Sequence, residues 1–166
     1  MVNILRIVAL AVCLGTAAQA QEKTLPSMWV GDLLIHAPVL RVTPAGAPVA
    51  GGYLAVENTG DTQEVLLSAR ADISPDVQLH EMVMSGDVMK MRAIDGGITV
   101  PAGETVRLMP GGYHLMLMKP STALVAGETH DVSLEFLNAG SVTLPFTVAP
   151  LDVIRDLGKD AHGHGN

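Results

Sequence analysis

The segment His130-Asp-Val-Ser-Leu-Glu-Phe-Leu-Asn-Ala-Gly140 shows the pattern that decides the fold of the chain. Its apolar residues Val132, Leu134 and Phe136 alternate with polar residues, and a period of two predicts a half-buried β-strand. The Asn138-Ala-Gly140 that follows is typical of a turn, because Asn and Gly tolerate the backbone angles of a tight reversal. The segment therefore predicts a strand that ends in a turn.

Short alternating runs of the same kind recur along the chain, for example over residues 53–56 and 105–108, and no long helical pattern is present. Residues rich in Gly, Pro and Asn separate the runs at short intervals, at positions 44–46, 51–52, 58–60, 96–97, 101–103 and 110–112. Regularly spaced short strands with such turns predict an all-β fold, either a β-sandwich or a Greek-key barrel.

Residues 1–20 have the organisation of an export signal. Arg6 gives a positive start, residues 7–15 form an apolar core, and Ala18-Gln-Ala20 is a cleavage site of small residues. The apolar span is too short for a membrane helix, and Cys13, which lies within it, is in a poor context for lipid attachment. We therefore expect cleavage after Ala20, a periplasmic mature protein and no lipid anchor.

Cleavage would leave 146 of the 166 residues, enough for one domain with its own core. We expect residues 21–149 to form that domain, with 21–31 as a leading arm, and residues 150–166 to form an exposed, flexible tail. No segment of the mature chain approaches the length of a membrane span, so we expect no membrane insertion. Nine scattered basic residues against 17 acidic ones make nucleic acid an unexpected partner.

Methionine and histidine gather in the second half of the chain. Seven of the eight methionines that follow the signal lie between Met82 and Met118, together with His80 and His114. Thioether sulfur and neutral imidazole suit monovalent copper, whereas calcium and magnesium prefer oxygen and structural zinc usually takes thiolate. The mature chain would contain no cysteine, so it lacks the thiolate of a blue-copper site and carries ligands that persist in an oxidising compartment.

Period-two spacing would place many of these side chains on common strand faces. A strand ending near residue 84, a turn at residues 85–87 and a returning strand would form one ribbon. The five potential ligands that this ribbon would carry are His80, Met82, Met84, Met89 and Met91.

A second segment would add to that set. After the turn at residues 110–112, His114 and Met116 share one side of a strand, while Leu115 and Leu117 would face the core. Two imidazoles and two thioethers from separate segments would make a low-coordinate Cu(I) pocket.

The spaced pattern His-x10-Met at His80 to Met91, followed by His-x-Met at His114 to Met116, resembles that of the periplasmic copper chaperones of the PCuAC family. Phrases that also resemble the family framework, within about residues 33–148, are Thr43-Pro-Ala-Gly46, Gly52-Tyr-Leu54, Asn58-Thr-Gly60, Val88-Met-Lys-Met-Arg92, Val100-Pro-Ala-Gly103 and Pro110-Gly-Gly-Tyr-His-Leu-Met116. The resemblance implies a cupredoxin-like β-barrel that binds one Cu(I) through His80, Met91, His114 and Met116. It also implies delivery of copper toward the CuA centre of a cytochrome oxidase subunit, with a Sco-like protein as a further partner.

Two features depart from the family pattern. The gap from Met91 to His114 is 22 residues where the family more often has 21, which is consistent with one extra residue near positions 95–97. Val39 stands where the family often has an aromatic residue. A longer turn should leave the ligand geometry intact, and residue 39 does not touch the ligands.

The other methionines and histidines have more than one interpretation. Met82, Met84, Met89 and Met118 could line the pocket or fill the core, and the sequence favours neither. His36 and His130 are expected at the surface or rim. The Gly-spaced pair His162 and His164 could bind Cu(II) or simply solubilise the chain end.

These features favour a metallochaperone that transfers copper by ligand exchange. A copper-sequestering protein without a dedicated acceptor would use the same ligands and is the alternative. The chain shows no nucleophile elbow, zinc-protease helix, nucleotide-binding loop or carboxylate pair, so we do not expect an enzyme.

Overall fold

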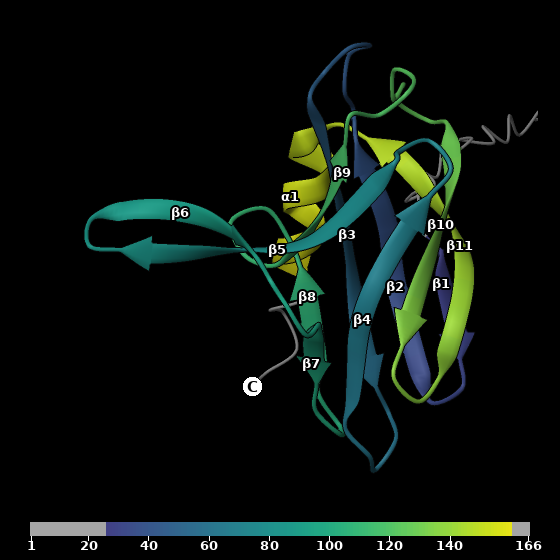
Figure 1. Cartoon of the computed structure of the whole chain (residues 1–166). Helices are drawn as coiled ribbons and strands as arrows, with labels where there is room; N and C mark the ends of the chain where they lie inside the picture. The colour runs from purple at the N-terminus through teal and green to yellow at the C-terminus, as the bar shows by residue number, and fades with distance from the viewer. Residues whose placement is uncertain (1–25, 161–166) are drawn as a thin grey trace, which may run out of the picture.

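The computed structural model describes residues 26–160, which form eleven β-strands followed by one helix (Figure 1). The strands are β1 (Ser27–Val30), β2 (Leu33–Arg41), β3 (Val49–Asn58), β4 (Glu64–Ala71), β5 (Asp76–Ser85), β6 (Val88–Ala93), β7 (Ile98–Val100), β8 (Thr105–Leu108), β9 (His114–Met118), β10 (Thr129–Phe136) and β11 (Gly140–Ala149). The predicted all-β fold is confirmed. No helix within the described residues is long and apolar enough to span a membrane.

The strands form one continuous, strongly curved sheet in the order β6-β5-β9-β3-β2-β11-β10-β4-β7. β1 adds to β2 and β8 adds to β3 outside this path. All neighbours are antiparallel except β2 and β11. Because β4 also contacts β5, the sheet curls around one interior and gives the two-layered shape of a sandwich (Figure 1).

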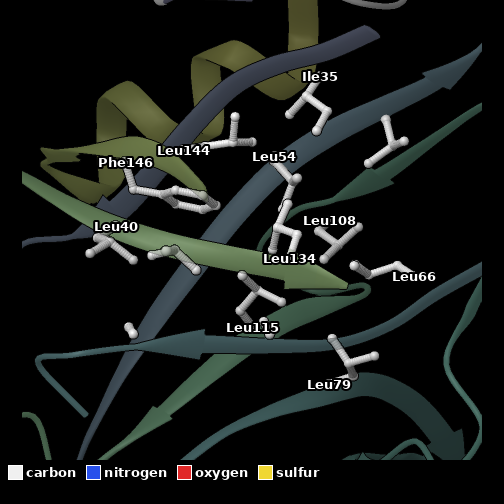
Figure 2. Packing of buried hydrophobic residues seen from close by; sticks show 14 of the residues in the cluster. Ile35, Leu40, Leu54, Leu66, Leu79, Leu108, Leu115, Leu134, Leu144 and Phe146 are labelled. Carbon is white, nitrogen blue, oxygen red and sulfur yellow. The ribbon is translucent and has the colours of Figure 1, made fainter. Parts of the chain in front are cut away.

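The interior is filled by the inward-facing half of each alternating run (Figure 2). Val132, Leu134 and Phe136, on which the strand prediction rested, are each buried to within 1% of full burial. Leu115 and Leu117 of β9 are completely buried in the same core, as predicted. Period two therefore fixes the outer face of β9 as the face of His114 and Met116.

β3 positions β9 within the sheet. Its first half pairs with β9 over Val49–Gly52, and its second half pairs with β8. Gly52 has no side chain where Leu115 and Leu40 approach, because a Cβ there would lie 3.2 Å from both. This close approach sets β9 directly against β3.

The predicted leading arm is wrong for its last residues, because Ser27–Val30 form β1 and pair with the first half of β2. β11 covers β2 only from Val39 onward, and the register of β2 shifts between His36 and Val39. The first half of β2 would otherwise be an open sheet edge, and β1 closes it.

The predicted flexible tail is also wrong over much of its length, because Leu151–Asp160 form the helix α1. Ile154 is completely buried against Val39, Tyr53 and Ala149, and Leu157 packs beside it. The sequence features that favour this helix cover only a few residues: a proline at position 150, Asp152 in the first turn, and apolar residues three apart. Helix α1 also covers Val39, one of the two features that depart from the pattern of the family that the sequence resembles.

The export signal and the remainder of the tail, including His162 and His164, lie outside the described residues.

Candidate metal centre

β5 belongs to two parts of the molecule. Residues Asp76 to His80 pair with β9 inside the sheet, whereas the later residues of β5 pair only with β6. The β5–β6 hairpin consequently projects from the body (Figure 1). The turn between the strands falls at Gly86, whose φ of 65° suits glycine, and confirms the predicted ribbon.

His80 and His114 face each other where the hairpin leaves the sheet. They are register partners in β5 and β9, and their ring centroids lie 5.7 Å apart with the planes inclined by 52°. Although His114 lies on the outer face, its exposed fraction is only 6%. The loop before β9 folds over this position, because the Gly112 carbonyl accepts hydrogen bonds from the Met82 amide at 3.2 Å and from the His114 ring at 3.0 Å.

Hydrogen bonds fix a different tautomer for each ring. His114 Nδ1 must carry the proton, because its partner is the Gly112 carbonyl, which only accepts. His80 Nε2 lies 2.9 Å from Gln78 Oε1, and Gln78 orients this oxygen by donating from its nitrogen to the Asp76 carboxylate at 2.6 Å. His80 therefore carries its proton on Nε2.

The opposite nitrogens are then left with free lone pairs. His80 Nδ1 and His114 Nε2 are both buried and have no hydrogen-bond partner. Unpaired buried acceptors are uncommon, since each loses its hydration without replacement. Two such atoms on contacting rings, each backed by a hydrogen bond on the far nitrogen, match the way proteins prepare imidazoles for a metal ion.

Electrostatics keep one of these rings neutral. Burial lowers the pKa of His80 below its ordinary value, and the neighbouring His114 lowers it further. Desolvation and a second imidazole both oppose a positive charge. The lone pair of His80 is consequently available at neutral pH.

The two methionines of the predicted ligand set flank the histidine pair. Met116 is two residues beyond His114 in β9, opposite Gln78. Met91 lies in β6, two residues before Ala93, which is the register partner of His80. Because cross-strand partners and alternate residues share a face, all four predicted ligands lie on one surface of the sheet, with the methionines on opposite sides of the histidines. Ligation by these residues stays a prediction.

Exposure differs between the two thioethers. Met116 is 7% exposed, whereas Met91, on the projecting hairpin, is 49% exposed. Among residues 26–160, no third His, Cys, Asp or Glu side chain joins the pair in a cluster suited to a metal. One side of the candidate site is therefore walled and the other open.

Comparison with known proteins shows which family this chain belongs to. The family model described as "Putative lipoprotein LpqE-like" matches residues 33–148. "Putative lipoprotein Lxx21020" of Leifsonia xyli subsp. xyli (strain CTCB07) is 32% identical over 126 residues, which are 76% of this chain and 72% of that protein. The chain belongs to the LpqE-like family.

Solved structures extend the likeness of this LpqE-like chain. The "Copper-bound PCuAC domain from PmoF2" is 26% identical, with a TM-score of 0.64 over 76% of this chain and 99% of that domain. The "Apo PCuAC domain from PmoF1", at 22% identity, has the same TM-score over 75% of this chain and 99% of that domain, and shows the shared fold. The "Solution structure of CuI-DR1885 from Deinococcus Radiodurans" shares the fold at 24% identity, with a TM-score of 0.53 over 80% of this chain and 84% of that one. The fold of the LpqE-like chain is thus that of PCuAC domains, in agreement with the resemblance found in its sequence.

The remaining methionines of the LpqE-like chain are divided by position. Met84 and Met89 face each other across the hairpin and are 63% and 46% exposed, which excludes a role as core fillers. Met82 is half-buried opposite Met91. Met118 is also half-buried, at the far end of β9 opposite Asp76.

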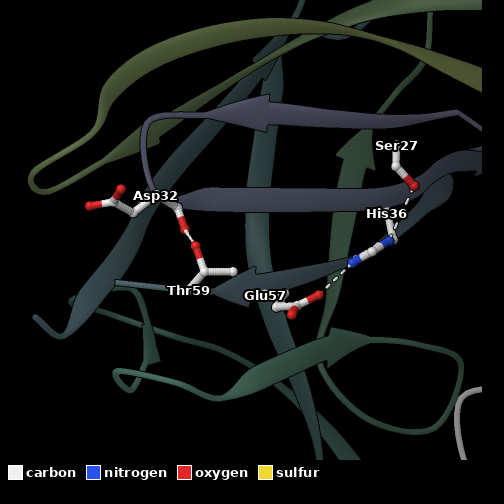
Figure 3. A network of polar contacts seen from close by, with 5 residues as sticks. All are labelled: Ser27, Asp32, His36, Glu57 and Thr59. Atoms are coloured by element: carbon white, nitrogen blue, oxygen red, sulfur yellow. Dashed lines mark hydrogen bonds and ion pairs between the residues drawn. The ribbon is translucent and has the colours of Figure 1, made fainter. Parts of the chain in front are cut away.

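Two histidines lie outside the site, as predicted. His36 Nε2 lies 2.9 Å from Glu57 Oε2, and its Nδ1 lies 3.2 Å from the Ser27 hydroxyl, in a polar network at the surface that joins β1, β2 and β3 (Figure 3). His130 lies 3.6 Å from Glu128 near the start of β10. Neither ring contacts the His80 and His114 pair.

Sequence reasoning missed the supporting residues Asp76, Gln78 and Gly112. Asp76 and Gln78 occupy alternate positions before His80, so the same period-two argument could have placed them on its face. Gly112 was recognised as a turn residue, but a carbonyl contact leaves no trace in a side-chain pattern.

Tyr53 is a further unrecognised neighbour. Its ring lies over Gly51, the register partner of Met116, and a Cβ at Gly51 would lie 2.5 Å from the Tyr53 hydroxyl oxygen. Burial raises the pKa of Tyr53 despite the nearby charges of Arg41 and Arg155. The wall beside Met116 is therefore continuous with the cluster beneath α1.

Proposed function

We propose that this chain binds one Cu(I) ion through His80, Met91, His114 and Met116 and hands it to another protein as a periplasmic metallochaperone. The observation that carries the proposal is the pair of buried, unpartnered nitrogens, His80 Nδ1 and His114 Nε2, on contacting rings. Two buried nitrogens without hydrogen-bond partners are stabilised when one cation takes both lone pairs.

The donor set favours Cu(I) over other ions. Imidazole and thioether are neutral, so the ion keeps its positive charge, and a singly charged soft ion is the easiest to hold in a partly buried place without a carboxylate. The likeness to a copper-bound PCuAC domain supports the same metal. Gln78 and Gly112 fix the rings before the ion arrives, which reduces the ordering that binding requires.

Transfer would proceed by ligand exchange from the open side. Met91 is the exposed ligand, whereas His114 and Met116 are walled in by the loop before β9 and by neighbouring strands. An incoming ligand would first replace Met91 and then the imidazoles, so that copper is never released to water. The net direction follows the difference in affinity between the two proteins.

We propose a CuA-type oxidase subunit as the acceptor and a Sco-like protein as a further partner, on the basis of the PCuAC resemblance. The alternative is copper sequestration without a dedicated acceptor. In either case the chain-end residues His162 and His164 would either add a Cu(II) site or only solubilise the chain end. We propose export to the periplasm on the basis of residues 1–20, and the lipoprotein description of the family supports export.

An anaerobic Cu(I) titration against a chromophoric competitor tests the site. The proteins compared are the chain from Gln21, the double variant His114→Ala/Met116→Ala, and a chain that ends at Asp160. The matched control His36→Ala/Met28→Ala also removes one imidazole and one thioether, but from β2 and β1, outside the proposed ligand set. One tight equivalent that only the first double variant loses is the expected result. Unchanged tight binding in that variant would contradict the assignment.

The acceptor requires its own experiment. Loaded protein is mixed with an apo CuA domain, and the copper content of each is measured after separation. Movement of copper to the acceptor supports the chaperone, whereas retention at equal concentrations supports sequestration.

A further inference from the structure

The two faces of the β5–β6 hairpin differ in chemistry. One face carries two cross-strand methionine pairs, Met82 with Met91 and Met84 with Met89. The other face carries the ion pair of Glu81 with Arg92, joined at 2.7 Å, and the pair of Val83 with Lys90. Methionine is therefore not spread over the hairpin at random, and the four thioethers lie on the face of the histidine pair.

Packing does not explain the outer methionines. β6 is exposed along its whole length, and residues 83–85 at the end of β5 pair only with β6. Met84 and Met89 thus expose large apolar side chains at the end of a two-stranded ribbon, where they bury little and contribute little stability. A polar residue would serve a merely structural purpose better at both positions.

The spacing of the pairs is regular. Two residues along a strand span about 7 Å, so the Met82 and Met91 pair lies about 7 Å from the histidines and the Met84 and Met89 pair about 14 Å away. The β-carbons of a cross-strand pair lie about 5 Å apart, and methionine has three rotatable bonds, so two sulfurs of a pair can converge on one ion. Met91 belongs both to this row of methionine pairs and to the proposed ligand set of the histidine site.

We propose that Met84 and Met89, assisted by Met82, form a second, weaker Cu(I) site on the hairpin through which copper enters and leaves the histidine site. The proposal rests on the proposed function, because the inner site is the destination. A thioether-only site binds more weakly than one with imidazoles that are already oriented, so occupancy of the outer site precedes transfer and does not compete with storage.

Each transfer step is an exchange of ligands on an ion that stays monovalent. The donor's bond to Cu(I) breaks as a bond to Met84 or Met89 sulfur forms. Met82 and Met91 then replace the outer pair. His80 Nδ1, His114 Nε2 and the Met116 sulfur then replace Met82, which leaves the ion on the four proposed ligands. No electron or proton moves, because both imidazole nitrogens already carry free lone pairs.

Methionine methyl NMR on the exported chain from Gln21 would follow both sites at once. The protein carries ¹³C-methyl methionine, and its signals are assigned by single Met→Leu changes. Under anaerobic conditions the first equivalent of Cu(I) should shift Met91 and Met116, and the second should shift Met84 and Met89. Met28 in β1 should stay unchanged and serves as the internal control. Static Met84 and Met89 signals at two equivalents would overturn the hairpin site.

The rate of loading tests the entry role. In Met84→Leu/Met89→Leu the inner site should load about tenfold more slowly, at the lower end of what loss of a supporting metal partner costs, while its affinity stays unchanged. A relocation variant adds Val83→Met and Lys90→Met to those two changes. The relocation variant restores two thioethers to the hairpin, but on the face opposite the histidine pair. Its inner site should therefore load as slowly as that of the double variant. A wild-type rate in either variant would overturn the entry role.

The two proposals can fail separately. If the first equivalent leaves Met91 and Met116 unshifted, the histidine site fails. If those signals shift and the Met84 and Met89 signals do not, only the hairpin site fails.

Discussion

β5 runs through two regions that differ in almost every physical respect. Up to His80 it pairs with β9 over a packed core, and beyond His80 its strand partner is β6 alone, in a projecting hairpin. The first region orients imidazoles through Gln78 and Gly112, whereas the second exposes thioethers. The comparison indicates that the ligands needing fixed orientation lie on the rigid part, and those that must be exchanged lie on the accessible part.

The largest effect is expected at the rigid part. Replacing His114 by Leu should weaken Cu(I) binding by more than the roughly 100-fold that loss of a supporting residue costs. The same change should leave the metal-free fold as stable or more stable, because it removes a buried nitrogen without a partner. Competition titration and thermal unfolding of the metal-free protein measure the two effects. A strong loss of stability would contradict the claim that the unpartnered nitrogen of His114 costs the metal-free fold free energy.

The packing of α1 beside the site should show the next largest effect. Ile154→Ala in α1 empties a completely buried position and should lower the free energy of unfolding by about 2–5 kcal/mol. Denaturant unfolding measures the change, with Val153→Ala on the exposed side of α1 as the control. Equal effects of the two changes would show that α1 does not pack as described.

Gln78→Leu separates orientation from ligation. It keeps both imidazoles but removes the acceptor that fixes the His80 tautomer, and should weaken Cu(I) binding by about 10–100-fold. Gln63→Leu, in the loop before β4, is the matched control. Wild-type affinity in Gln78→Leu would mean that His80 needs no support.

The pH dependence should distinguish His80 from an acidic group in the body. Because the pKa of His80 is lowered in the fold, the unfolded chain takes up its proton first, so stability falls as pH falls through the ordinary histidine range and levels off below the lowered pKa. Burial raises the pKa of Glu64, but hydrogen bonds from Val65, Asn138 and Ala139 outweigh burial and leave it lowered. Its contribution is therefore lost at more acidic pH, as the pH falls through its lowered pKa.

Unfolding measured across pH should show both steps. His80→Leu should remove only the step in the histidine range. Persistence of that step in the variant would assign it to another group.

The smallest effect is expected on the hairpin. Met84→Leu should change the free energy of unfolding by less than about 0.5 kcal/mol, because the side chain is exposed and the shape is similar. Amide hydrogens of β6 should exchange faster than those of β9, which β3 and β5 pair on both sides. Slow amide exchange in β6 would show that the hairpin is no more mobile than the part of the sheet that contains β9.

The strands and the faces of their side chains could largely be predicted from the sequence, because the alternation of apolar and polar residues depends only on neighbours in the chain. The burial of Leu115 and Leu117, the shared face of His114 and Met116, and the turn at Gly86 all follow from alternation and turn chemistry. The pairing of His80 with His114 is long-range. Ligand chemistry and family resemblance grouped the two residues, but no local pattern made them register partners.

What the sequence did not predict depends on long-range contacts. β1 is a strand because β11 leaves half of β2 uncovered, and α1 is held by Val39 and Tyr53 from distant strands. The tautomers depend on a carbonyl and an amide whose roles only the folded geometry shows. Local patterns carry no information about such contacts.

The most direct test of the central claim is long-range ¹H–¹⁵N NMR of the imidazole rings, before and after one equivalent of Cu(I). The metal-free protein should show His80 protonated at Nε2 and His114 at Nδ1, and copper should shift His80 Nδ1 and His114 Nε2 while His36 and His130 stay unchanged. Reversed tautomers, or shifts at His36 or His130 in place of the pair, would contradict the account.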